Sequence, residues 1–112
     1  MSSQPVEVTS LLWLKAGVTA DQARNYFTRL LAPIVRRHGG EPLADGYPLF
    51  VEATVRGELK PDVIDGFRFP SQEAMEALFQ DPAYQEIVPI RDATFDMTRQ
   101  SVFRVSRAAP TA

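Results

Sequence analysis

The spacing of hydrophobic and polar residues changes along the chain, between a two-residue repeat typical of strands and a repeat of three to four residues typical of helices. Residues 6–14 are rich in β-branched and large apolar side chains and contain no glycine or proline, which predicts a strand buried on both faces. Residues 47–56 alternate apolar with other side chains, so one face is expected to pack and the other to carry polar groups. After a short turn, residues 62–69 are predicted to return as its hairpin partner. A last strand is predicted over residues 99–107.

A long helix is predicted between the first two strands. Thr19 and Gln22 are spaced so that the hydroxyl and the amide cap each other's backbone donors, which is typical of a helix start. Apolar side chains then recur every three or four residues, as on one helical face. Pro33 predicts a kink, since proline removes a helical hydrogen bond, and Gly39–Gly40 predicts the end. The helix is expected over residues 19–38.

A second helix is predicted to begin after Pro70, with Ser71 as its N-cap. Asp81 followed by Pro82 is expected to end this helix and to cap a further turn that contains Tyr84.

The order of elements predicts an α+β, ferredoxin-like βαββαβ domain: a four-stranded antiparallel sheet with two helices on one face. We expect a single domain over residues 1–112, with its core over about 6–107. Phe103 and Val105 are assigned to the inner face of the last strand. The face without helices needs cover, because residues 6–14 are apolar on both sides. Association of two sheets would form a homodimer, a dimeric α/β barrel with a cavity between its subunits.

Composition and charge exclude several functions. The chain has 12 basic and 14 acidic residues, a net charge of −2 and no cysteine. This balance disfavours nucleic-acid binding, and the absence of cysteine excludes disulfides and thiolate chemistry. No apolar run approaches the length of a membrane span, and the N-terminus does not resemble a secretion signal, so we expect a cytoplasmic protein without membrane association. We expect no metal and no other cofactor, because a lone histidine is a poor metal site.

Several short motifs, in this order and spacing, resemble a family of uncharacterised bacterial domains in the dimeric α/β-barrel superfamily. They are Ala32-Pro33, His38-Gly39-Gly40, Phe69-Pro70-Ser71, Asp81-Pro82-Ala83-Tyr84 and Arg91. A more distant resemblance to EthD-like proteins is carried by Lys15-Ala16-Gly17-Val18-Thr19, Ala32-Pro33 and Asp65-Gly66. The superfamily includes cofactor-independent monooxygenases, lactone isomerases, polyketide cyclases, haem enzymes and proteins of unknown role, so the resemblance implies the fold more strongly than a reaction.

Two positions depart from the resembled families. EthD-like proteins usually carry a histidine just before the Ala-Pro pair, where this chain has Leu31. The uncharacterised family typically has glutamate before Phe-Pro-Ser, where this chain has Arg68. The first change removes an acid–base group, and the second favours an anionic ligand if Arg68 faces the cleft.

Three residues are candidates for catalysis. His38 is the only histidine and its ordinary pKa lies near neutrality, although it also fits a structural role at the helix C-terminus. Glu52 would move a proton on the open sheet face. Tyr84, with Arg91, would hold a substrate oxygen or donate a proton, or would simply pack as an aromatic ring.

The candidates for ligand binding are Trp13, Asp65, Arg68, Arg91 and Arg104. The arginines would bind a carboxylate or phenolate, or form ion pairs between strands. Trp13, with Tyr26 and Tyr47, would form an aromatic wall or belong to the core or the dimer interface. Asp65 and Phe67 are two residues apart on one predicted strand and so face the same side, which is assigned to the helices. A carboxyl on that side requires either a bulge at Gly66 that redirects it or a position at the sheet edge.

Three functions remain open. The chain is either a cofactor-independent enzyme acting by acid–base chemistry on an aromatic, lactone or polyketide-like molecule, or a non-catalytic ligand-binding or dimerisation module. The third alternative, a pure interaction module, predicts that the sheet interior between the subunits is filled with side chains and has no cavity.

Overall fold

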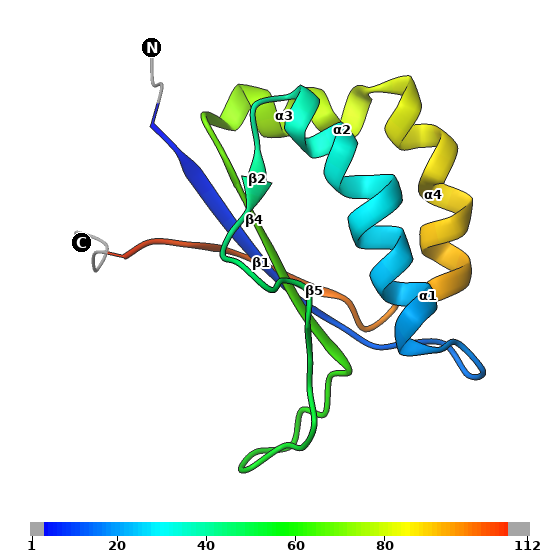
Figure 1. The fold of residues 1–112 in the computed structure, drawn as a ribbon. Helices are drawn as coiled ribbons and strands as arrows, with labels where there is room; N and C mark the ends of the chain where they lie inside the picture. Colours follow the sequence, from blue (N-terminus) through cyan, green and yellow to red (C-terminus); the bar gives the residue numbers. More distant parts are fainter. Residues whose placement is uncertain (1–3, 108–112) are drawn as a thin grey trace.

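A computed structural model of the chain describes residues 4–107, so the predicted domain limits at residues 1 and 112 lie outside them. Five strands form one antiparallel sheet: β1 (Val6–Leu12), β2 (Glu41–Pro42), β3 (Leu49–Phe50), β4 (Val63–Phe69) and β5 (Ser101–Val105). Their order is β2-β4-β1-β5, and β3 also pairs with β4, on the same edge as β2. All helices lie on one face of this sheet (Figure 1). The predicted βαββαβ order is therefore confirmed, with the second strand divided into β2 and β3.

The first helical segment runs without interruption through α1 (Ala20–Asn25), the π-helical turn η1 (Tyr26–Leu31) and α2 (Ala32–Arg37). The predicted capping box is present, since Thr19 Oγ1 accepts from the amide of Gln22 and Gln22 Oε1 accepts from the amide of Thr19. Pro33 directly follows the wider η1 turn. In this turn the Ala32 amide donates to the Phe27 carbonyl five residues earlier. The helix ends at Arg37, one residue before the predicted end, and Gly39, whose φ is +80°, turns the chain away from it as predicted.

The second helical segment consists of α3 (Gln72–Gln80) and α4 (Pro82–Thr94). Ser71 Oγ accepts from the amide of Ala74, which confirms the predicted N-cap. Asp81 Oδ1 accepts from the amide of Ala83, so the same residue ends α3 and caps α4. The predicted single further turn is in fact a helix of 13 residues.

The strand predicted over residues 47–56 is wrong in extent, because only Leu49–Phe50 pair with β4. The last backbone–backbone hydrogen bond of this hairpin runs from the Val51 amide to the Asp62 carbonyl, and beyond it the Thr54 hydroxyl donates to the Leu59 carbonyl. Gly57 and Pro61 interrupt the returning chain, so residues 52–56 have no continuous strand to pair with. The segment between β3 and β4 instead projects away from the body of the protein (Figure 1).

The core lies between the sheet and the helices and includes Phe69, Phe95 and Val35, all almost fully buried. Phe103 and Val105 are not on this side, which corrects the prediction for the last strand. They pair with Thr9 and Glu7 of β1, whereas the helix-facing Val8 pairs with Arg104. Cross-strand partners share a face, so Phe103 and Val105 lie on the face without helices, where they are 50% and 39% exposed.

Candidate functional site

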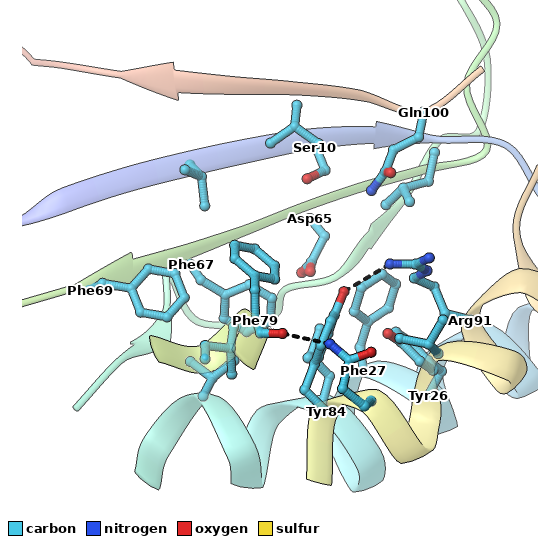
Figure 2. Close-up of a pocket in the computed structure, with 18 residues that line it drawn as sticks. Ser10, Tyr26, Phe27, Asp65, Phe67, Phe69, Phe79, Tyr84, Arg91 and Gln100 are labelled. Carbon is cyan, nitrogen blue, oxygen red and sulfur yellow. Dashed lines mark hydrogen bonds between the residues drawn. The ribbon is translucent and has the colours of Figure 1, made fainter. Parts of the chain in front are cut away.

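A cavity of about 470 Å³ lies between the sheet and the helices within a single chain (Figure 2). Its floor is formed by helix-facing residues of β1, β4 and β5, and its other walls come from α2, α3, α4 and the η1 turn. This is the face opposite to the one on which the inter-subunit cavity was predicted. The pure interaction module concerned the face between subunits, so it stays a prediction.

The cavity has an apolar region and a polar region. Apolar walls are supplied by Val8, Val35, Phe67, Phe69, Leu78 and Phe79. Polar side chains are supplied by Ser10, Tyr26, Asp65, Tyr84, Arg91 and Gln100. In Figure 2, Phe69 lies at one end of the cavity, Arg91 and Gln100 lie at the other, and Asp65 lies between them. A molecule with an apolar body and one polar group matches this division.

Asp65 is the acid of this cavity. It belongs to β4, is 3% exposed and lines the cavity beside Phe67. Burial raises the pKa of Asp65 from 3.8 to about 7, partly opposed by a hydrogen bond from the Gly66 backbone. Within residues 4–107, no other side chain forms a hydrogen bond with this carboxyl. Asp65 is thus able to gain and lose a proton near neutral pH.

Tyr84 and Arg91 form a hydrogen-bonded pair on α4. Arg91 Nη1 donates to the Tyr84 hydroxyl over 2.9 Å, and the Nε and Nη2 atoms of Arg91 contact Asp92 Oδ1 at 3.0 and 2.9 Å. Burial opposes the charge of Arg91, but the contacts with Asp92 and Tyr84 outweigh it, so the pKa of Arg91 is raised. Because the Tyr84 oxygen accepts from Arg91, its own proton is free to be donated to a ligand oxygen.

Tyr26 adds a second phenol from the η1 turn. It is 3% exposed, and its ring packs edge-on against Phe27 and Phe95. Burial raises the pKa of Tyr26 well above its ordinary value, and the nearby Tyr84 adds to this effect. Tyr26 is therefore a neutral hydrogen-bonding group in the cavity, and π-helical turns of this kind often occur at functional sites.

Three of the residues singled out from the sequence come together in the cavity: Asp65, Tyr84 and Arg91. The structure resolves the placement of Asp65, because β4 pairs with β1 in unbroken register, so no bulge redirects it. The expected strand parity holds, and Asp65 faces the helices together with Phe67.

His38 lies outside the cavity, in a hydrogen bond between its Nε2 atom and Asp81 Oδ2 at 2.8 Å. This contact joins the end of α2 to the α3–α4 junction, which fits the structural alternative for His38. The contact lowers the pKa of Asp81, and the hydrogen bond from the Ala83 amide adds to the effect. Leu31, which stands where EthD-like proteins usually have histidine, does line the cavity.

The remaining candidates also lie outside the main cavity. Arg68 pairs with Glu7 across the sheet, on the face without helices, so it does not reverse the charge of the cleft. Arg104 is on the helix side, where it donates to Gln72 Oε1 over 3.2 Å rather than lining the open face. Glu52 is exposed in the projecting segment, because β3 ends at Phe50, and Trp13 is buried just after β1.

Sequence reasoning missed Ser10 and Gln100, which line the polar region, and gave Tyr26 only an aromatic role. The available signal was alternation within β1, where Ser10 occupies the same face as Val8 and Leu12. A polar residue between two core-facing residues indicates a hydrated or functional position. No group of three or more metal-ligating side chains occurs within the described range. In that range there is also no helix long and apolar enough to cross a bilayer.

Residues 12–104 match the model of a family described as a domain of unknown function, DUF1330. No curated protein matches the chain. Among solved structures, the chain is similar to the protein of unknown function RPA0582 from Rhodopseudomonas palustris, with a TM-score of 0.76 and 22% identity over 97% of this chain and 86% of that one.

Two further structures share the fold at lower identity. An uncharacterised NIPSNAP domain protein from Burkholderia xenovorans has a TM-score of 0.64 and 15% identity, covering 97% of this chain and 99% of that one. A protein from Bacteroides fragilis, described as dimeric and ferredoxin-like, has a TM-score of 0.56 and 10% identity, covering 90% and 94%. These neighbours support the ferredoxin-like fold, while the relation to EthD-like proteins remains a prediction.

Proposed function

Since the chain belongs to the DUF1330 family, whose description assigns no activity, we propose a function from the site itself: cofactor-independent proton transfer on a small molecule with an apolar body and a carbonyl or phenol oxygen. The observation that carries this proposal is a buried carboxyl, Asp65, in a cavity that also holds a Tyr84–Arg91 hydrogen-bonded pair. The reaction class is that of an isomerase or cyclase that acts by acid–base chemistry.

In the proposed step, the ionised carboxylate of Asp65 takes a proton from a carbon next to the substrate carbonyl. The electron pair of the broken C–H bond forms a C=C bond, and the carbonyl π electrons move onto oxygen to give an enolate. In a substrate whose β and γ carbons are already joined by a C=C bond, this enolate is a dienolate. Asp65, now neutral, returns the proton to the γ carbon, the electron pair of the β,γ bond forms the new C–H bond, and the oxygen lone pair re-forms the carbonyl with the C=C bond shifted to the α,β position, without oxidation or reduction. A carboxyl with a pKa of about 7 is suited to both halves of this cycle at neutral pH.

Tyr84 and Arg91 are proposed to stabilise the enolate oxygen. The Tyr84 hydroxyl donates to that oxygen, while Arg91 supports the developing negative charge through its hydrogen bond to the Tyr84 oxygen. The apolar walls strengthen this effect, because electrostatic interactions are less screened away from water. Tyr26 supplies a second phenol to the same region.

The shape and lining of the cavity favour aromatic, lactone or polyketide-like ligands. Phe67, Phe69 and Phe79 offer aromatic surfaces for a planar body, and about 470 Å³ is within the usual range for small-molecule sites. The alternative is a non-catalytic ligand-binding module. It is favoured by Leu31, an apolar residue of the cavity at the position where the resembled EthD-like proteins usually place histidine.

A homodimer is part of the proposal. Leu11, Ile64 and Leu49 lie together on the face without helices, joined by the half-exposed Phe103. Val55, in the projecting segment, is 98% exposed. A second sheet packed on this face would cover these apolar side chains, and would do so on the side of the sheet opposite to the cavity.

The test is solvent-deuterium incorporation into a panel of enolisable aromatic ketones, butenolide lactones and β-keto esters, followed by NMR. We expect the wild-type protein to accelerate exchange at one carbon of at least one compound. Asp65→Asn should reduce the rate at least 100-fold and Tyr84→Phe about 10-fold or more. Glu52→Gln is the matched control, because it alters a carboxylate outside the cavity and should leave the rate unchanged.

Two results would contradict the proposal. An Asp65→Asn protein that retains the full exchange rate would exclude Asp65 as the base. Binding of panel compounds to the wild-type protein without any exchange would instead favour the non-catalytic module.

A further inference from the structure

A second cavity, of about 90 Å³, lies behind Asp65. Phe27, Asp65 and Phe67 border both this cavity and the main one, so Asp65 stands in the wall between them. Ala32 lines the small cavity but not the main one. Asp65 therefore contributes to the lining of two separate spaces.

The small cavity exists because the edge of the sheet is interrupted at this point. β2 pairs with Phe67 and Arg68 of β4, and β3 pairs with Val63 and Ile64. Asp65 and Gly66 have no strand partner on this edge, and the segment 43–48 covers them instead. The Leu43 amide donates to the Gly66 carbonyl at 2.9 Å, and the Leu43 side chain packs against Gly66.

The small cavity lies close to the surface. Arg36, Pro42 and Tyr47 border both the small cavity and a hollow of about 640 Å³, which is otherwise lined by segment 41–46. Arg36 and several residues of that segment are exposed to solvent. Arg36, Pro42 and Tyr47 thus separate the small cavity from an exposed hollow, so the side of Asp65 that borders the small cavity lies one layer of side chains from solvent.

The small cavity suits water better than a ligand. At about 30 Å³ per molecule, a volume of 90 Å³ holds about three waters. Polar partners are available from Asp65, Arg36, Thr28 and Tyr47, which border it. Thr28 donates its hydroxyl proton to the Arg24 carbonyl, so its oxygen is left to accept from a water molecule.

We propose that the small cavity is a water site that hydrates Asp65 and connects it to bulk solvent, so that Asp65 exchanges its proton while a ligand fills the main cavity. The proposal rests on the proposed function only for the use of this proton. The titratable groups around Asp65 are Tyr26, Tyr84 and Arg91 on the side of the main cavity, and Arg36 and Tyr47 on the side of the small one. Solvent deuterium could otherwise reach Asp65 only past the bound ligand.

The experiment uses Ala32→Leu, which places an apolar side chain in the small cavity and leaves the main cavity lining unchanged. High-resolution crystal structures of the wild-type protein should show at least two ordered waters linking Asp65 to Arg36 or Tyr47, and the variant should lack them. A ¹³C NMR titration of the Asp65 carboxyl should give a pKa at least one unit higher in the variant, because the ionised form has lost its hydration. Ala77→Leu, the same change at an exposed position of α3, is the control and should leave the titration unchanged.

Ala32→Val, a smaller insertion, provides the same comparison if Ala32→Leu does not fold. A dry or closed small cavity in the wild-type crystal would overturn the proposal. An unchanged Asp65 titration in a variant whose new side chain occupies the cavity would also overturn it. Neither the crystal structures nor the titration depends on turnover. A failure of the proposed reaction would be seen separately, as an Asp65→Asn protein that keeps its activity.

Discussion

Replacing Asp65 with asparagine should make the protein more stable at neutral and alkaline pH. A raised pKa means that the folded chain holds the Asp65 proton more tightly than the unfolded chain does, with values of about 7 and 3.8. Between these values, unfolding releases a proton, so wild-type stability falls by about 1.4 kcal/mol per pH unit. The stability that the protonated Asp65 contributes is fully present below pH 4 and is lost as the pH rises through 7.

The difference between the two pKa values sets the size of the effect. About three units correspond to roughly 4 kcal/mol, which is the cost of burying the ionised carboxylate above pH 7. Asparagine has a similar shape and carries no charge, so Asp65→Asn avoids this cost. For a domain of this size, roughly 4 kcal/mol corresponds to an increase in Tm of about 15 °C.

The assay is urea unfolding of the wild-type and Asp65→Asn proteins from pH 4 to pH 9, at one protein concentration. The difference in unfolding free energy between them should be small near pH 4 and grow until about pH 8. Hydrogen bonds lower the pKa values of Asp81 and Asp96 in both proteins alike, so their effect on the pH dependence of stability cancels in the difference. Asp45→Asn, in an exposed loop, is the control and should show no such pH dependence. A difference that is constant across this range would refute the placement of an ionisable Asp65 in an apolar environment.

Three further predictions concern the fold and its surfaces. Gly40→Ala should destabilise the protein by about 2 kcal/mol in urea unfolding, because a Cβ there would lie 2.7 Å from Val35 Cγ1 and 3.0 Å from the Arg68 carbonyl oxygen; a loss below 0.5 kcal/mol would contradict the close packing. Thr19→Ala should cost about 1 kcal/mol by removing the N-cap, whereas Thr19→Ser should be nearly neutral. Phe103→Asp should convert the proposed dimer to a monomer in analytical ultracentrifugation while leaving the cavity intact; a variant that stays dimeric would place the interface elsewhere.

Local signals in the sequence were sufficient for the helices. Thr19, Ser71 and Asp81 cap helices through contacts within three residues, so their roles depend on little beyond the neighbouring chain. The edge strand was different, because alternation over residues 47–56 shows only that the segment is compatible with a strand. Whether it pairs depends on the returning chain, which Gly57 and Pro61 interrupt.

Part of the site could also be predicted from local spacing along the chain. Tyr84 and Arg91 are seven residues apart on one helix, so their contact follows from helical spacing. The parity of Asp65 also pointed to the helix side, but a carboxyl there is acceptable only where a cavity exists, and the sequence does not reveal one. His38 attracted attention as the only histidine, yet its position depends on Asp81, 43 residues away.

The most direct test of the central claim is the titration of the Asp65 carboxyl carbon by ¹³C NMR in the wild-type protein, with Asp65→Asn to assign the signal. A midpoint near 7 is predicted, because the carboxyl is buried in the apolar cavity beside Tyr84 and Arg91. A midpoint near 4 would show a carboxylate as exposed to solvent as in the unfolded chain, and would contradict its proposed role as the proton carrier.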